Sequence, residues 1–396
     1  MAFELKAKIA PVDALNRPGF QALAAINPLG PLAELPGKWV GTGFNQIWRP
    51  FQVTSDRFLE LNLTTETLEF SESVGAIPNR GLLQPDIELA GVHYLQQVQD
   101  SLAGVGIHVE PGFWVTVPQT SNPAELPTVA RMGSIPHGTT VNSQGTAQAV
   151  NGGPIIDPVS IRPFSIGSAP PPNTAVAFPP FNEADLSVPT LFRLPKPIPP
   201  SITQAMVNNP NSVLTAAIAG QTITRMTVLT ISTKAPASPP PPAVPNVGGG
   251  TDNIAFLQGG PAGPNADGAQ MTATFWIEHV AAGPDGPAFL QLQYTQTVLL
   301  NFNGLSWPHV SVATLRKQEW RSRCESGPSI KPFEIETNPA GQLEHRHARG
   351  RRFRETVREP AHCPKRRWRR CNRRGARARN RRATSRMPCG NGLRRP

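Results

Sequence analysis

The first 318 residues contain no cysteine, because all four cysteines lie after them, at Cys324, Cys363, Cys371 and Cys389. Disulfide bonds therefore do not stabilise this part of the chain, which fits a reducing compartment. The chain also lacks an apolar run of about 18 residues and a signal-peptide pattern at its start. We therefore expect a soluble, cytoplasmic protein without a membrane partner.

Several common catalytic motifs are also missing. The sequence has no HExxH, no CxxC pair, no P-loop and no GxGxxG after a strand. These absences exclude the usual zinc hydrolase, phosphate-loop and dinucleotide-binding signatures. With two tyrosines and eight histidines in 396 residues, function has to be sought in single residues.

Proline and glycine are abundant, with 45 Pro and 34 Gly, about a fifth of the chain. This content disfavours long helices and favours strands and turns. Short β-type runs separated by turn residues lie at 37–44, 58–70, 91–99, 106–118, 128–135, 139–150, 270–280, 289–302 and 306–318. We predict an all-β, lipocalin-like antiparallel β-barrel of about eight to ten strands, with room inside for one ligand.

Alternation within the run 58–70 supports an antiparallel sheet. Leu59, Leu61 and Leu63 alternate with Glu60 and Asn62. Because successive side chains of a strand point to opposite faces, one face of this strand is predicted to be buried and the other wet.

The predicted barrel extends over residues 37–318, after a Pro-punctuated lead-in at 1–36. Between about 151 and 268 the chain is rich in proline, as in SAPPPNTAVAFPPF and ASPPPPAVP. We interpret this region as a long insertion over the barrel. Within it, ITQAMVNN predicts a short helix, and the run 213–233 predicts a strand or hairpin.

The segment 319–396 is strongly basic. It holds 23 Lys and Arg against 7 Asp and Glu, a net charge of +16, so the first 318 residues carry −5 of the chain's +11. Without apolar periodicity the segment is predicted to be disordered by itself. We interpret it as an out-of-frame extension of the barrel sequence. One alternative is an arm that binds nucleic acid. The other is a zinc site formed by His362, Cys363 and Cys371.

His309 is the most informative histidine. Period two places His309, Ser311, Ala313 and Leu315 on one face of the last strand. If this face is the interior, two small side chains leave a flat cavity beside a nitrogen donor, which suits a porphyrin with imidazole as axial ligand. The structural alternative is a histidine at a strand end that bonds a carbonyl group.

Other residues are candidates for the same site. His137 lies between Pro136 and Gly138, at a bend or strand start, where it can face the opposite side of the pocket or be an ordinary turn residue. His108 shares a face with Glu110, which predicts an ion pair or, with further ligands, a metal site.

The order of three motifs resembles the nitrobindin-type heme-binding β-barrels and the bacterial FMP-type heme-binding proteins. The motifs are GKWVGTG at 37–43, HVEPGFW at 108–114, and PHVSVATLRK at 308–317. The resemblance covers about residues 37–150 and 270–318, and the Pro-rich insertion departs from the short nitrobindin form.

The resemblance implies a bound heme b. It implies that His309 is the proximal iron ligand, and it makes His137 and Thr139 candidates for the distal side; Trp39 and Trp307 are candidates for lining the pocket. The implied partners are heme, a small oxidant or diatomic ligand, and a peroxidase partner.

The implied activity is peroxidase-like or peroxynitrite isomerase-like, while a heme carrier without catalysis remains open. Two other classes of function compete with heme binding. One is a carrier of a fatty acid or another apolar ligand without iron. The other is nucleic-acid binding through the Arg-rich tail.

Overall fold

The computed structural model describes residues 28–51, 57–71, 76–122, 124–168, 181–234, 249–284 and 286–318. Most of the lead-in and the whole tail 319–396 lie outside the described residues. The predictions of disorder, nucleic-acid binding and zinc binding for the tail are therefore not addressed by this structure. Over the described ranges, no helix is both long and apolar enough to cross a membrane.

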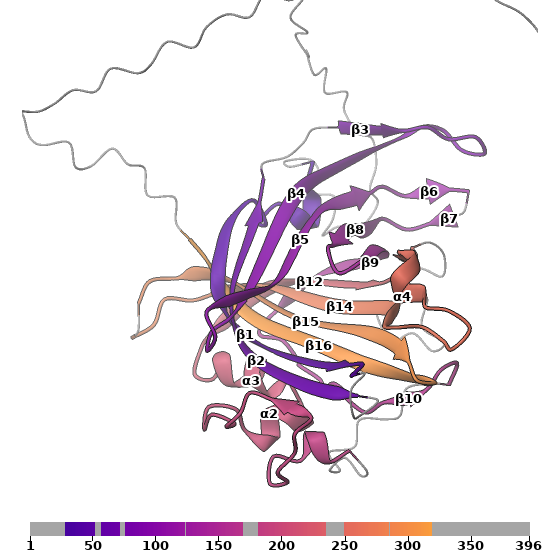
Figure 1. Ribbon diagram of the computed structural model, residues 1–396. Coiled ribbons are helices and arrows are strands. Elements are labelled where there is room, and N and C mark those ends of the chain that lie inside the picture. Colours follow the sequence, from indigo (N-terminus) through magenta and orange to yellow (C-terminus); the bar gives the residue numbers. More distant parts are fainter. Residues whose placement is uncertain are drawn as a thin grey trace, which may run out of the picture. The chain divides into compact units, whose positions relative to one another are not determined.

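Ten strands form a closed antiparallel β-barrel (Figure 1). They are β1 (Gly37–Arg49), β2 (Phe58–Phe70), β4 (Ile87–Asp100), β5 (Val105–Val117), β8 (Thr128–Ile135), β9 (Thr139–Asn151), β12 (Ile223–Ser232), β14 (Asp267–Val280), β15 (Phe289–Phe302) and β16 (Leu305–Lys317). Their order around the barrel is β2-β1-β16-β15-β14-β12-β9-β8-β5-β4, and pairing of β2 with β4 closes it. The predicted all-β barrel of eight to ten strands is confirmed.

Shorter elements lie outside this ring of strands. The short strands are β3 (Ala76–Asn79), β6 (Thr120–Ser121), β7 (Ala124–Glu125), β10 (Phe164–Ser165), β11 (Arg193–Leu194) and β13 (Gly250–Asn253). The helical segments are η1 (Gly30–Leu32), η2 (Asn182–Ala184), α2 (Gln204–Asn208), α3 (Ser212–Ala217) and α4 (Ala255–Gln258). The predicted short helix in ITQAMVNN corresponds to α2.

The nine predicted runs coincide with nine of the ten barrel strands, and the tenth lies where we predicted an insertion. β12 pairs with β9 on one side and β14 on the other. The extent predicted for the insertion, 151–268, is therefore too long, because this segment contributes a strand to the barrel wall. The strand or hairpin predicted within the run 213–233 corresponds to β12, whose Thr227, Leu229 and Ile231 alternate with other residues.

The barrel has two ends with different connections. The turns β1–β2, β4–β5, β8–β9 and β15–β16 surround one end, which we call the mouth. The other end, the closed end, is filled by a core to which the lead-in adds Leu29, Leu32 and Leu35 around η1. The large side chains of this core include Trp39, Phe70, Trp114, Phe275, Ile277, Leu292 and Leu315.

A second apolar cluster lies on the outer face of the barrel. Phe44, Trp48, Val310 and Val312 of β1 and β16 pack there against apolar residues of the insertion, such as Leu214 of α3. Figure 1 shows α2 and α3 beside β1 and β2. The insertion thus covers one side of the barrel, as expected from the sequence.

The leucine face predicted for the run 58–70 belongs to this outer cluster. Leu59 and Leu61 are fully buried, but they contact the outer cluster and not the barrel core. The interior row of β2 instead carries Thr64, Glu66 and Leu68. The prediction that the opposite face is wet is therefore wrong, because the insertion buries one face and the barrel encloses the other.

Candidate functional site

The closing strand β16 places His309 on the interior row of the barrel. Residues Ala313 and Leu315 of this row are fully buried in the barrel core. His309 lies opposite Val298 of β15, which belongs to the same core. The predicted common face is therefore the interior, with His309 near the mouth, since the β15–β16 turn precedes it by only a few residues.

The flat cavity was expected beside Ser311 and Ala313, and Ala313 is closely enclosed by its neighbours. Ala313 faces Tyr294 across the β15–β16 ladder, and both residues have no more than 2% of their surface exposed. Large side chains of the core fill the space that the small residue leaves. Any ligand has to lie nearer the mouth than these two residues.

Hydrogen bonds hold the imidazole of His309 from one side. Its Nε2 lies 2.7 Å from Oδ1 of Asn45 on β1. The same oxygen accepts a hydrogen bond of 2.8 Å from the hydroxyl of Ser311. The structural alternative, a histidine that bonds a carbonyl group, is thus met by the side-chain amide carbonyl group of Asn45.

The surroundings keep the ring of His309 neutral. Burial, and to a smaller extent electrostatic repulsion from His108 and His137, lower its pKa to about 3. A neutral imidazole retains a nitrogen lone pair, which is the form that binds a metal ion. His309 is therefore in the protonation state of a ligand throughout the physiological pH range.

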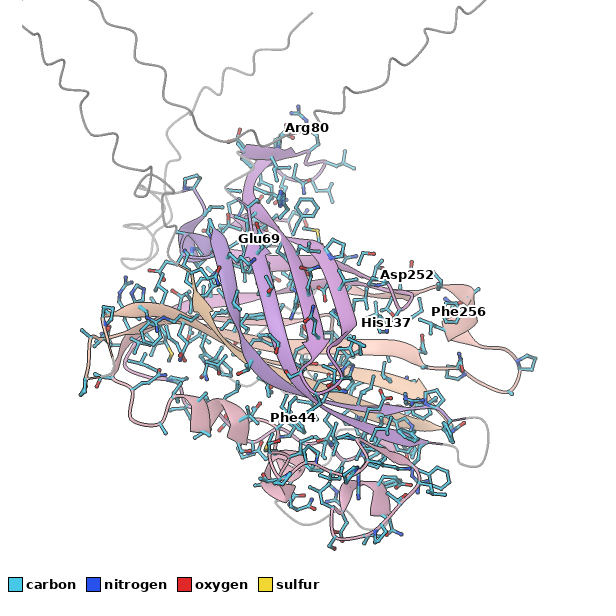
Figure 2. All side chains as sticks on the ribbon, turned by 60° about the vertical axis from the view of Figure 1, so that its left-hand side comes forward. Phe44, Glu69, Arg80, His137, Asp252 and Phe256 are labelled. Carbon is cyan, nitrogen blue, oxygen red and sulfur yellow. The ribbon has the colours of Figure 1, made fainter. Side chains whose placement is uncertain are left out.

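His108 and His137 face each other near the mouth. Their ring centroids are 5.7 Å apart. His137 lies in the turn between β8 and β9 (Figure 2), and burial together with the charge of His108 lowers its pKa. The predicted pair of His108 with Glu110 is confirmed, with 3.3 Å between Nε2 and Oε2.

A hollow of about 340 Å³ opens beside these two rings. The ladder between β5 and β8 ends at Gly112 and Gly133, so the first half of β5 has no strand pairing with β8. We call this opening the histidine hollow. It is lined by Gln97, Val98, Gln99, Gly106, Ile107, His108, Val109 and His137.

A buried ion pair lies deeper in the barrel than the histidine hollow. Arg131 of β8 and Glu110 of β5 are 2% and 1% exposed, and their charged groups are 2.7 Å apart. The guanidinium group also donates to the hydroxyl of Tyr94 at 2.9 Å and to Oε1 of Gln296 at 2.6 Å. Burial by itself raises the pKa of Glu110, but Arg131 and hydrogen bonds from His108 and Tyr94 outweigh it and lower the pKa to about 2.

A second carboxyl group is buried beside this ion pair. Glu66 of β2 accepts hydrogen bonds from Tyr294 at 2.6 Å and from Thr64 at 2.8 Å. Burial raises its pKa, although these bonds and one from Gln96 oppose the effect. Together with the ion pair, Glu66 forms a polar layer between the apolar closed end and the mouth.

This polar layer was not predicted from the sequence. The signal that could have revealed it is alternation, because Glu66 shares its face with Leu68 and Phe70. Similarly, Arg131 shares its face with Val129. A charged residue within an otherwise apolar row often marks a buried, paired charge.

The other predicted pocket residues lie in three different places. Trp39 is fully buried in the closed-end core, where its Nε1 donates to the Leu35 carbonyl group at 2.8 Å. Trp307 belongs to the outer cluster and stacks on Phe302, with ring centroids 4.9 Å apart. Thr139 donates to Oδ1 of Asn253 at 2.7 Å, beside a separate hollow of about 180 Å³.

The structure thus places His309, His108 and His137 near the mouth, Trp39 in the closed-end core, and Trp307 beside the β15–β16 turn in the outer cluster. Among the residues that the structure describes, no cluster of three or more His, Cys, Asp or Glu has a geometry suited to a metal ion. Protein ligands alone do not assemble a metal site here. His309 is a single nitrogen donor.

Comparisons with known proteins do not identify a family. No protein-family model matches the chain, and no curated protein matches it. Among solved structures, the chain is similar to the crystal structure of Rv2717c from M. tuberculosis, at 15% sequence identity and a TM-score of 0.30. The match covers 76% of this chain and 99% of that chain.

A similarity of this size does not assign a family or a function. The barrel itself is compatible with a ligand-binding barrel of the lipocalin type. Since large side chains fill the closed end, the mouth is the part of the interior that leaves room for a ligand.

Proposed function

We propose that the protein binds one heme b at the mouth of the barrel, with His309 as the axial ligand of the iron. The observation that carries the proposal is a neutral imidazole on the interior row, oriented by Asn45, near two further imidazoles. A single neutral histidine is a common protein ligand of heme iron. The resemblance of the three sequence motifs to nitrobindin-type barrels supports the same ligand.

The histidine hollow can take part of such a group, and His309 lies outside the residues that line it, so a heme bound by His309 would have to extend beyond the hollow. The histidine hollow, at about 340 Å³, is near the lower end of the roughly 300–1,000 Å³ typical of small-molecule sites. Val98, Ile107 and Val109 contribute apolar surface to it, and its imidazoles contribute hydrogen-bonding groups. We expect part of the porphyrin to remain in contact with solvent.

A bound heme would supply an iron centre that can bind peroxide or a diatomic nitrogen oxide. The chain's own contribution is to position His309 and to offer a neutral imidazole, His137, near the opening. Because the pKa of His137 is lowered, its ring is neutral near neutral pH and can accept a hydrogen bond or a proton from a small oxidant. Peroxidase-like or peroxynitrite isomerase-like activity is the corresponding proposal for catalysis, with Thr139 a weaker distal candidate.

The competing carrier function has less support from the described residues. An apolar ligand such as a fatty acid needs an empty apolar interior, yet the closed end is filled by Trp39, Phe275 and other side chains. The charged Arg131 and Glu110 lie next along the interior. Nucleic-acid binding through the tail concerns residues that the structure does not describe.

Titration of the full chain with hemin tests the proposal. We expect a Soret band that saturates at one hemin per chain, and in His309→Ala a lost or shifted band. His93→Ala is the matched control, because His93 is an exposed histidine on β4, and it should behave like the wild type. Equal spectra and affinities for wild type and His309→Ala would reject His309 as the ligand, and binding of a fluorescent fatty acid without hemin binding would favour the carrier.

A further inference from the structure

A chain of polar side chains crosses four adjacent strands and ends at His309. Asp100 of β4 accepts a hydrogen bond of 2.7 Å from Nδ2 of Asn62 on β2. Oδ1 of Asn62 accepts from Nδ2 of Asn45 on β1 at 3.1 Å. Oδ1 of Asn45 lies 2.7 Å from Nε2 of His309 on β16. Each of the four strands contributes one residue to this relay.

The carboxylate at the start gives the relay a direction. An ionised carboxylate only accepts hydrogen bonds, and the second oxygen of Asp100 already accepts from the backbone amides of Leu102 and Ala103 at 2.7 and 2.9 Å. Asn62 must therefore turn its amide nitrogen toward Asp100 and its oxygen toward Asn45. The amide of Asn45 then has to present its oxygen to His309.

The orientation of Asn45 determines which nitrogen of His309 carries the proton. A carbonyl oxygen is only an acceptor, so Nε2 must be the donor in this hydrogen bond. The hydroxyl of Ser311 donates to the same oxygen at 2.8 Å, which supports the assignment of the amide oxygen to this side. In a neutral imidazole with Nε2 protonated, the lone pair is on Nδ1.

We propose that the relay from Asp100 through Asn62 and Asn45 holds His309 in the tautomer protonated at Nε2 and leaves Nδ1 as the nitrogen with the free lone pair. Asn45 is then a positioning residue, since it acts through His309. Hydrogen bonds of this kind orient metal-binding histidines in many proteins. The use of Nδ1 toward iron rests on the proposed heme function, whereas the tautomer itself does not.

Nitrogen NMR of the full chain without hemin tests the tautomer directly. Long-range ¹H–¹⁵N correlations distinguish a protonated ring nitrogen from an unprotonated one. For His309 we expect a protonated Nε2 and an unprotonated Nδ1 in the wild type. A protonated Nδ1 would overturn the proposal, whatever the protein binds.

Variants of the relay extend the test. In Asn45→Ala, and less strongly in Asn62→Leu, we expect the signals of His309 to shift toward a mixture of the two tautomers. Asn142→Ala is the control, because Asn142 is an exposed asparagine on β9, and it should leave these signals unchanged. An unchanged tautomer in a folded Asn45→Ala chain, judged by its circular dichroism, would contradict the role of Asn45.

Hemin titration separates this inference from the proposed function. If both hold, Asn45→Ala weakens hemin binding by about 10- to 100-fold, the usual effect of losing such a partner, and Asn142→Ala does not. If the tautomer is as expected but the wild type binds no hemin, the relay stands and the heme proposal falls. If hemin binds through His309 while the NMR shows Nδ1 protonated, the relay falls and the heme proposal stands.

Discussion

The two ends of the barrel interior are built from the same strands but differ in chemistry. At the closed end, the interior rows of β1 and β16 carry Trp39 and Leu315, which pack without polar contacts except for one indole hydrogen bond. Toward the mouth, the same two rows carry Asn45, His309 and Ser311, which bond to one another. The comparison shows that one end provides stability and the other offers reactive groups.

The polar layer of Arg131, Glu110 and Glu66 lies between these two regions. Arg131 and Glu110 form an ion pair and Glu66 is held by hydrogen bonds, and all three are buried, so the layer ends the apolar core. Such a buried pair gives little net stability compared with apolar packing, but losing one partner is costly because the other charge stays buried. Substitutions in this layer can therefore test its effect on stability independently of the closed end and of the mouth.

The largest effect is expected from Arg131→Met. Without the guanidinium group, the carboxylate of Glu110 is buried next to Tyr94 and His108 alone. We expect the free energy of unfolding to fall by about 3–5 kcal/mol, the usual cost of breaking a buried pair, as measured by urea denaturation. Adding Glu110→Gln to this variant should recover part of the loss, and no recovery would argue against an isolated charge as the cause.

Leu315→Ala affects the closed end by itself. Removal of this fully buried side chain should reduce the free energy of unfolding by about 3 kcal/mol, through lost burial and the cavity left behind. We expect hemin affinity to be unchanged, because Leu315 lies away from the mouth. If hemin binding fell as strongly as in His309→Ala, the separation of stability from ligand binding along the barrel would be wrong.

A smaller effect is expected when the free energy of unfolding is measured at decreasing pH. The pKa of Glu110 is about 2 in the folded chain, below the roughly 4.3 of an unfolded glutamate. A depressed carboxyl pKa stabilises the fold above the unfolded value, and this contribution is lost as the pH falls toward 2. Between pH 5 and 2 we expect Glu110 to account for about 2–3 kcal/mol of lost stability.

Urea denaturation at several pH values measures this dependence. In Arg131→Met the contribution of Glu110 should largely disappear, because Arg131 is the main cause that lowers the pKa of that carboxyl group. The stability curve of the variant should then be flatter in acid. Curves of equal slope for wild type and variant would show that other carboxyl groups dominate.

Much of the fold could be predicted from the sequence. Runs such as 58–70, 128–135 and 289–302 match β2, β8 and β15 in both bounds, because β-branched and aromatic residues alternate between clear turn signals. Period two also placed His309 on one face with Ser311, Ala313 and Leu315, and the structure shows that this face is the interior. β12 was less visible, since a strand between proline-rich segments has no turn signals of its own.

Other features depended on contacts between distant segments. Alternation indicated that Leu59 and Leu61 are buried, but the layer that buries them is the insertion and not the barrel core. The close enclosure of Ala313 arises from Tyr294, a neighbour on another strand. The positions of Trp39 and Trp307 in two different cores could not be distinguished either, because both are aromatic residues in strand patterns.

The sequence by itself determined the periodicity of each strand, the division between an acidic body and a basic tail, and the row of β16 on which His309 lies. Only the tertiary structure decided what fills the interior and which groups meet there. The relay from Asp100 to His309 uses one residue from each of four strands, and the ion pair joins β5 to β8. Such arrangements follow from the closure of the barrel, because hydrogen-bond register, and not sequence distance, sets which side chains come within reach.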